Sequence, residues 1–263
     1  MSGRLDGSAI VVTGGAAGLG LAYARRFLRE GACVFLADIV DPADAVASLD
    51  AGDRAAGGRV DVASAASVDA MVAAAERRLG RIDVLVNNAA VFATLTPRPF
   101  EAIPEEEWDR VMAVDLKSML LATQAAVPDM ERRGAGSIIC ISSVAGLRGY
   151  GRTAYAAAKA GVIGFVKSVA VQLGPRGIRV NAIAPGTVWT PMVEDLGEQA
   201  RERRRRATPL GTEGTAWDIG WGALYLASDE ARWVTGQVLV IDAGLTATAS
   251  AGGSGPHPDR TGS

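Results

Sequence analysis

The sequence has little of the chemistry that many catalytic sites use, with one histidine and two cysteines among 263 residues. The histidine, His257, lies in a C-terminal segment rich in glycine, serine and proline, and we expect residues 246–263 to form a disordered tail. A Ser–His–Asp triad is therefore not expected, because it needs a histidine in the folded part of the chain. Cys33 and Cys140 lie in separate apolar runs without CxxC spacing. They predict buried thiols in a reducing, cytoplasmic compartment and no metal site.

Strong charge and long apolar runs are also missing. The formal net charge is −2, which gives no sign of binding to nucleic acid or to an anionic membrane. The first residues lack a long apolar stretch, so we expect no signal peptide, and we expect no run long enough to span a membrane. Hydrophobic residues make up 49% of the chain, enough to fill the core of a large α/β domain.

Short β-branched runs alternate with alanine-rich amphipathic segments along the chain. Such alternation predicts one doubly wound α/β domain over 1–245, with a parallel sheet covered by helices on both faces. The expected strands are residues 9–13, 33–38, 59–62, 82–87, 137–142, 178–183 and 237–242. The expected helices are residues 19–30, 64–79, 105–132, 153–173 and 215–228. A ligand should bind at the carboxyl ends of the strands.

A glycine-rich turn, "TGGAAGLG", follows the first expected strand and precedes a helix. Gly14, Gly18 and Gly20 would let the backbone approach a pyrophosphate at the helix N-terminus. Asp38 ends the second strand, where an acid suits a ribose 2′-hydroxyl. The alternatives are an ordinary tight turn and a solvated strand-end carboxylate. We favour the dinucleotide interpretation, because both features occur in the expected order.

Several motifs in series resemble the short-chain dehydrogenase/reductase family, from about residue 5 to residue 245. They are the glycine-rich turn, "NNAA" at 87–90, "ISSVAG" at 141–146, "YAAAK" at 155–159, "NAIAPGTVWT" at 181–190 and "LASDEARWVTGQVLVIDAG" near the end. The resemblance implies a single Rossmann-type domain, a seven-stranded parallel sheet of order 3-2-1-4-5-6-7, and a substrate lid at about 187–215.

The resemblance also implies roles for individual residues. The implied catalytic residues are Ser143, Tyr155, Lys159 and Asp115. The implied cofactor-binding residues are Gly14, Ala17, Gly18, Leu19, Gly20, Asp38, Ile39, Asp61, Val62, Asn88, Ala89, Tyr155, Lys159, Pro185, Gly186, Val188 and Thr190. Asn88 could instead be a plain turn former, and Thr190 could be a helix N-cap.

The spacing of Tyr155 and Lys159 has its own physical meaning. Residues four apart share one helix face, so the phenol and the ammonium should point into one cleft. A free tyrosine has a pKa of about 10, and a cation about 4 Å away favours the phenolate by up to about 4 kcal/mol before desolvation. We therefore expect Lys159 to lower the pKa of Tyr155 and make it a general acid/base. The alternative is an exposed pair without chemistry.

Three departures from the family pattern matter. Asp115 stands where asparagine is usual, and an extra carboxylate near Lys159 would change the local electrostatics. Ser143 lies 12 residues before Tyr155 rather than 13, which leaves Ser142 as the alternative serine. Ala90 stands where glycine is commoner.

The cofactor is expected to be NAD, because Asp38 would repel a 2′-phosphate and Ile39 is not basic. The loop 91–100 and residues 147–150 should line the mouth with Phe92, Leu95, Leu147 and Tyr150. This apolar set favours a small, mainly apolar secondary alcohol or ketone. The arginines at 203–206 read as a solvated helix face, with an acidic substrate as the less favoured alternative.

The function expected from these residues is an NAD-dependent oxidoreductase. The alternatives are a 3-oxoacyl-thioester (acyl-carrier-protein) reductase that uses NADPH, and a silent NAD-binding sensor or scaffold. Segments 105–132 and 153–173 carry apolar residues on more than one face, and the resemblance implies that they pair between subunits. We expect a homotetramer.

Overall fold

The fold is built on one parallel sheet of seven strands in a computed structural model that describes residues 3–92, 94–96, 98–189 and 197–248. The strands are β1 (Ala9–Thr13), β2 (Cys33–Asp38), β3 (Ala55–Arg59), β4 (Val84–Asn87), β5 (Gly136–Ile141), β6 (Ile178–Pro185) and β9 (Val238–Ile241). Their order is β3-β2-β1-β4-β5-β6-β9, and every pair is parallel. The predicted doubly wound fold and strand order are confirmed, with β9 as the seventh strand.

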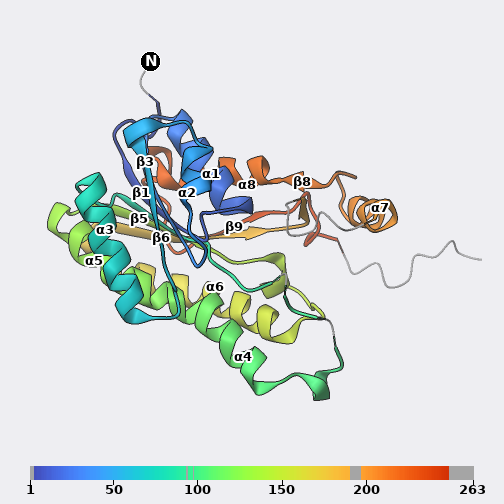
Figure 1. Cartoon of the computed structure of the whole chain (residues 1–263). Helices are drawn as coiled ribbons and strands as arrows, with labels where there is room; N and C mark the ends of the chain where they lie inside the picture. The colour runs from blue at the N-terminus through green and yellow to red at the C-terminus, as the bar shows by residue number, and fades with distance from the viewer. Residues whose placement is uncertain (1–2, 93, 97, 190–196, 249–263) are drawn as a thin grey trace, which may run out of the picture.

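Helices cover both faces of the sheet (Figure 1). One layer holds α1 (Gly18–Arg29), the short α2 (Ala43–Ala47) and α8 (Ala216–Ala227). The other holds α3 (Ala65–Leu79), α4 (Glu105–Met112), α5 (Ser118–Arg133) and α6 (Thr153–Leu173). Helix α7 (Glu198–Arg206) stands apart, beside the two-residue strands β7 (Val188–Trp189) and β8 (Gly214–Thr215).

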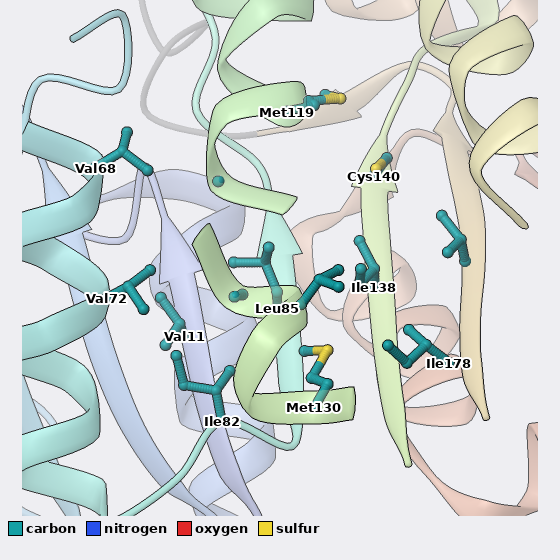
Figure 2. Close-up of a cluster of buried hydrophobic side chains, with 14 of the residues drawn as sticks. Val11, Val68, Val72, Ile82, Leu85, Met119, Met130, Ile138, Cys140 and Ile178 are labelled. Carbon is teal, nitrogen blue, oxygen red and sulfur yellow. The ribbon is translucent and has the colours of Figure 1, made fainter. Parts of the chain in front are cut away.

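Two apolar cores lie on the two sides of the sheet, because successive strand side chains point to opposite faces. In β1, Val11 packs with α3 and α5, whereas Val12 packs with α1 and α8. Figure 2 shows the first of these cores, where strand residues such as Leu85 and Ile138 meet Val72 of α3 and Met130 of α5. These two buried layers hold the strand ends in fixed positions.

The third strand lies earlier in the chain than predicted. The β-branched run 59–62 was the expected strand, but β3 is the alanine- and glycine-rich segment Ala55–Arg59. A side chain at Gly57 would meet the carbonyl oxygen of Leu36 at 2.7 Å, so a small residue is needed beside β2. Val60 and Val62 are buried just beyond the strand. Close backbone approach outweighs β-propensity here.

The helix expected over 105–132 is interrupted. A π-helical turn, Ala113–Lys117, separates α4 from α5. Such turns are rare and often occur at functional sites. This one carries Asp115, whose side chain is fully buried. Helices α2 and α7 and the β7–β8 pair were not predicted as elements, since each is short or highly charged.

Helix α6 is long and apolar enough to cross a membrane by length and composition. The expectation that no run reaches that length is therefore wrong on those two criteria. About 33% of its apolar window is buried, and Val162 and Val166 belong to the core against the sheet. A core helix passes the same test.

Candidate active site

A cleft of about 1430 Å³ runs across the carboxyl ends of the strands, as the parallel sheet predicts. Its walls come from the turn after β1, the ends of β2 to β6, the residues after β5, the start of α6, and α7. Most of the predicted site residues line it. The cofactor-binding residues among them are Gly14, Ala17, Gly18, Leu19, Asp38, Ile39, Asp61, Val62, Asn88, Ala89, Tyr155, Lys159, Pro185, Gly186 and Val188.

The turn after β1 requires its glycines. Gly14 and Gly18 have φ angles of 64° and 54°, in the left-handed region that side chains disfavour. A side chain at Gly20 would meet the carbonyl oxygen of Gly14 at 2.1 Å. Gly20 thus lies behind the cleft wall and closes the turn against α1, whereas Gly14 and Gly18 line the cleft.

Asn88 holds this turn from the neighbouring strand end. Its Nδ2 donates to the carbonyl oxygens of Thr13 and Gly14, each at 3.0 Å. Its backbone N–H donates to the Thr13 hydroxyl at 3.0 Å. Asn88 therefore fastens β4 to the glycine turn, which is more than the plain turn role that its sequence also allowed.

Asp38 ends β2 and faces the same turn. Its Oδ2 accepts from the backbone N–H of Ala16 at 3.0 Å, and its Oδ1 accepts from Val40 at 3.3 Å. Two backbone donors fix the carboxylate at the cleft wall, where it remains partly exposed. Asp61, beyond β3, is the second carboxylate that lines this end.

The opposite wall follows β6. The Gly186 N–H donates to the carbonyl oxygen of Ile241 at 2.8 Å. A side chain at Gly186 would meet the Cα of Asp242 at 2.6 Å, so this turn packs directly on the end of β9. Thr190, also predicted to bind the cofactor, lies outside the described residues.

Tyr155 and Lys159 lie on α6 and both line the cleft. Lys159 is 1% exposed, and its Nζ donates to the carbonyl oxygen of Ile141 at 3.1 Å. The Nζ is 5.4 Å from the centroid of the Tyr155 ring. Phe92 packs edge-on against that ring at 4.9 Å between centroids. The pair is thus enclosed, and the alternative of an exposed Tyr–Lys pair is wrong.

The two candidate serines make different contacts. The Ser142 hydroxyl is buried and donates to the carbonyl oxygen of Lys159 at 2.7 Å, a contact that braces α6 on β5. The Ser143 hydroxyl accepts from the N–H of Ala145 at 3.1 Å and is close enough to Tyr155 to lower the pKa of its phenol. These contacts favour Ser143 as the serine available to a substrate.

Asp115 lies behind the cleft wall, in contact with Lys159. Its Oδ1 accepts from the N–H of Val91 at 2.7 Å, and its Oδ2 lies 3.3 Å from the Lys159 Nζ. Both side chains are almost fully buried. Burial raises the pKa of Asp115, whereas the Lys159 charge and the Val91 N–H lower it, and the net direction is upward. The carboxylate and the ammonium form one buried ion pair.

The pKa of Tyr155 is raised, which is opposite to our expectation. Burial in the cleft raises it most, and the Lys159 charge lowers it less. The Asp115 carboxylate raises it further, because it opposes the cation that favours the phenolate. The sequence argument considered the cation and left out the desolvation and the anion behind it.

The end of the cleft around Tyr155 differs from the expected apolar mouth. Phe92 and Tyr150 line the cleft, but Leu95 is buried in a separate cluster and Leu147 is exposed outside it. Sequence reasoning missed most of the charged wall, to which the arginines at 110, 148, 152, 203 and 204 contribute. The arginines at 203 and 206 are exposed, as the predicted solvated face requires, whereas those at 204 and 205 are partly buried. The prediction is incomplete because the arginines at 203 and 204 also line the cleft.

Within the described ranges, no group of three or more histidine, cysteine, aspartate or glutamate side chains is placed to hold a metal ion.

Comparison with known proteins identifies the family. The family description "Enoyl-(Acyl carrier protein) reductase" matches residues 14–246. The crystal structure of a short-chain dehydrogenase/reductase from Burkholderia xenovorans aligns with a TM-score of 0.86 and 37% identity, over 94% of this chain and 100% of that one. This chain belongs to the short-chain dehydrogenase/reductase family. It is therefore an oxidoreductase of a family that binds a nicotinamide cofactor and acts on CH–OH groups.

Short-chain dehydrogenases similar to this chain carry different names. The 3-oxoacyl-acyl-carrier-protein reductase of Thermotoga maritima is 42% identical over 248 residues, which cover 92% of this chain and 99% of that protein. The 2-(S)-hydroxypropyl-CoM dehydrogenase 3 of Xanthobacter autotrophicus is 38% identical over 257 residues, covering 94% and 100%. The crystal structure of levodione reductase aligns with a TM-score of 0.88 and 35% identity, covering 94% and 100%.

Proposed function

We propose that the protein is an NAD-dependent oxidoreductase that interconverts a small secondary alcohol and its ketone, with Tyr155 as general acid/base. The observation that carries this proposal is one cleft that joins the glycine turn and Asp38 to Ser143, Tyr155 and Lys159. The first two features suit a dinucleotide, and the other three suit proton transfer at a carbonyl or hydroxyl oxygen.

Each of the site residues has a separate role in this mechanism. The Ser143 hydroxyl holds the substrate oxygen, and the Tyr155 phenol accepts a proton from the alcohol or donates one to the ketone oxygen. The buried Lys159 cation stabilises the phenolate form and would hold ribose hydroxyls. The nicotinamide, when bound, supplies or accepts the hydride. Phe92 packs on the Tyr155 ring and keeps water from the phenol.

The cofactor end supports NAD. Gly18 leaves room for a pyrophosphate, since no atom from elsewhere in the described chain lies within 4 Å of the place a side chain would occupy. Gly14 is needed for a different reason, because a side chain there would meet the Cα of Ala89 at 2.9 Å. Asp38 is held towards the glycine turn, where it would accept from a ribose hydroxyl and repel a 2′-phosphate. Ile39 lines the cleft beside it and brings no positive charge.

The second candidate is an NADPH-dependent 3-oxoacyl-thioester reductase. The name of the Thermotoga maritima relative favours it. Arg59 also favours it, since it pairs with Asp38 in strand register. Against it, the Arg59 Nε already donates to the carbonyl oxygen of Ile39 at 3.0 Å, and Arg59 does not line the cleft. A silent sensor or scaffold is the least supported candidate, because the three reactive side chains remain together.

The substrate region next to Tyr155 supports an apolar body around the reacting carbon. Phe92, Tyr150, Val144 and Leu245 line this part of the cleft.

We place the catalytic domain at 1–245 and a substrate lid at about 187–215. The proposed tail, 246–263, lies almost wholly outside the described residues. We propose a cytoplasmic protein that acts without nucleic acid, membrane or metal.

We also propose a homotetramer. Leu120 of α5 and Val171 of α6 are 42% and 77% exposed, which leaves apolar surface on the outer side of these helices. On the other flank, β9 is an edge strand, and Trp233 before it is 95% exposed. Two such surfaces suit two two-fold axes. Light scattering of the purified chain tests this, and a mass near 27.1 kDa would contradict it.

The function is tested by initial rates with NAD and NADP over a panel of secondary alcohols, followed by the absorbance of the reduced cofactor. We expect turnover with NAD and a clear preference for NAD over NADP. Preference for NADP would favour the thioester reductase, and binding of NAD without any turnover would favour the sensor.

A further inference from the structure

The charges that line the cleft are divided between its two ends. Of the residues that the structure describes, the lining carboxylates are Asp38 and Asp61, both at the cofactor end. The substrate end is lined by guanidinium groups, which we call the arginine wall: Arg148, Arg152, Arg203 and Arg204. A fifth, Arg110, lines the cleft from α4. Such a concentration of one sign in a concave site favours ligands of the opposite sign.

Arg152 lies next to the reacting groups. Its guanidinium stacks 4.2 Å from the centroid of the Phe92 ring, and that ring packs against the ring of Tyr155. Its Nε is buried and makes no hydrogen bond to any described residue. A buried donor without an acceptor is costly, so an anion that reaches this guanidinium would gain a strong, charge-assisted contact.

Arg204 is fixed in place, but its guanidinium group keeps one hydrogen-bond donor without a described partner. Its Nε lies 3.1 Å from Glu213 Oε1, and its Nη2 donates to the carbonyl oxygen of Val188 at 3.0 Å. Its Nη1 is buried without a described hydrogen-bond partner. Glu213 also faces Arg201 at 3.1 Å, so one buried carboxylate serves two guanidinium groups. A net positive charge is left on this side of the cleft.

The arginines on the two sides of α7 differ in their ion-pair partners. On the outer side, Arg205 and Arg206 pair with the glutamates of their own helix, Glu198 and Glu202. Arg206 is 79% exposed, as expected for a solvated ion pair. The inner side points Arg204 into the cleft instead, so its position there is not a consequence of high arginine content alone.

We propose that the substrate carries an oxyanion, a carboxylate, sulfonate or phosphate, that binds at the arginine wall through Arg152 and Arg204. The inference rests on the proposed function. The reacting carbon lies at Tyr155, an apolar segment lies against Phe92 and Tyr150, and the anionic group lies against the guanidinium groups of Arg152 and Arg204. The substrate is thus an oxo acid or hydroxy acid rather than a wholly apolar ketone.

The test uses methyl ketones of increasing chain length that end in a carboxylate, each beside its methyl ester. The ester keeps the ketone and the chain and removes the charge. For the chain length that fits, kcat/KM for the acid should exceed that for the ester by about tenfold or more, since one charged hydrogen bond is worth that much. The preference should weaken as salt is added. Sulfonate and phosphate analogues of the same length then identify the preferred oxyanion.

Variants locate the anion. Arg152→Gln and Arg204→Gln should each reduce kcat/KM for the acid about tenfold more than for the ester, and Arg152→Lys should recover part of the loss. Arg206→Gln is the matched control on the same helix, outside the cleft. It should leave the acid-to-ester ratio unchanged.

A binding measurement separates this inference from the proposed function. Calorimetry of the protein–NADH complex with acid and ester is carried out beside the rates. Turnover of esters without any preference for acids in rate or binding overturns the arginine site and leaves the function intact. Saturable binding of the acid without turnover of any ketone supports the site and overturns the function. The absence of both turnover and binding overturns the arginine site and the proposed function together.

Discussion

The two ends of the cleft are built in different ways. The proposed cofactor end comes from consecutive elements, β1, the glycine turn, α1 and β2, and its side chains are held by backbone hydrogen bonds such as that from Ala16 to Asp38. The substrate end is assembled from segments far apart in the chain, around Phe92, Arg152 and Arg204, and is held by ring stacking and ion pairs. The first end is acidic and the second is basic.

This difference separates what the family shares from what distinguishes its members. A turn that must approach a pyrophosphate tolerates few sequences, because the φ angles of Gly14 and Gly18 and the contact at Gly20 demand glycine. A wall of long side chains can change residue by residue without altering the sheet. Solved structures of relatives share the fold with this chain, and the names of similar proteins state different substrates.

The largest effect should come from Tyr155→Phe, which breaks the substrate end and leaves the cofactor end unchanged. Loss of the general acid/base should lower kcat by about a hundredfold to ten-thousandfold. The affinity for NADH, measured by fluorescence titration, should stay within about threefold, because the phenol hydroxyl alone is removed. Tyr225→Phe on α8 is the control. More than about a tenth of the wild-type rate in Tyr155→Phe would refute the role of this phenol.

A reversal of the charge at the proposed cofactor end should give the next largest effect. The double substitution Asp38→Ala with Ile39→Arg removes the carboxylate that accepts from the Ala16 N–H. It also adds a positively charged partner for a 2′-phosphate. The ratio of kcat/KM for NAD to that for NADP should fall by about tenfold to a hundredfold. The arginine wall is untouched, so the acid-to-ester preference should persist. Asp61→Asn, at the same end, should change the cofactor ratio far less; an equal change would assign discrimination to both acids.

The sequence predicted the geometry of the proposed cofactor end well because its determinants are local. The position of Asp38 after a buried strand and the order of glycines before a helix follow from neighbouring residues. The strand order also followed from the motifs. By contrast, β3 lies earlier in the chain than predicted, because the close approach of Gly57 to Leu36 outweighs β-propensity.

The substrate end was predicted poorly because its determinants are not local. The aromatic contact between Phe92 and Tyr155 joins residues 63 positions apart by their numbers, and no periodicity reports it. The arginines at 203–206 divide between solvent and cleft according to how α7 lies on Glu213, which helix periodicity alone does not fix. The direction of the Tyr155 pKa shift also needed burial, a tertiary property.

A smaller effect is expected from Asp115→Asn, which tests the anion behind the substrate end. Asparagine keeps an oxygen for the Val91 N–H and removes the negative charge beside Lys159. Because the Asp115 carboxylate raises the pKa of Tyr155, its removal should lower that pKa. Alcohol oxidation needs the phenolate, so the rising limb of kcat/KM against pH should move to lower pH.

The control for this prediction is Asp109→Asn on the exposed side of α4, which should not move the limb. The relevant measurement is the pH profile rather than the rate at one pH, because a purely structural role of Asp115 would lower the rate without moving the limb. A limb that stays in place or moves to higher pH would contradict the electrostatic role.

The smallest effect should come from Asp242, which lies under the wall between the two ends, against Gly186. Its carboxylate accepts from the N–H groups of Gly244 and Thr246 at 2.9 and 2.7 Å, and from the Thr246 hydroxyl at 2.7 Å. Burial raises the pKa of Asp242, but these hydrogen bonds and the charge of Arg148 lower it more, so the net direction is downward.

A lowered pKa in the folded state means that the carboxylate stabilises the fold above the unfolded pKa of about 4, and that this contribution is lost as the pH falls through the folded value. Asp242→Asn keeps one oxygen acceptor and removes the charge. It should lower the free energy of unfolding near neutral pH by about 1 kcal/mol or less, because the group is partly exposed and screened. Urea unfolding across pH measures the difference between wild type and variant, which should shrink towards zero in acid. Asp53→Asn, at a fully exposed side chain, should show no such pH dependence. A difference for Asp242→Asn that stays constant down to acidic pH would mean that shape, rather than charge, holds this turn.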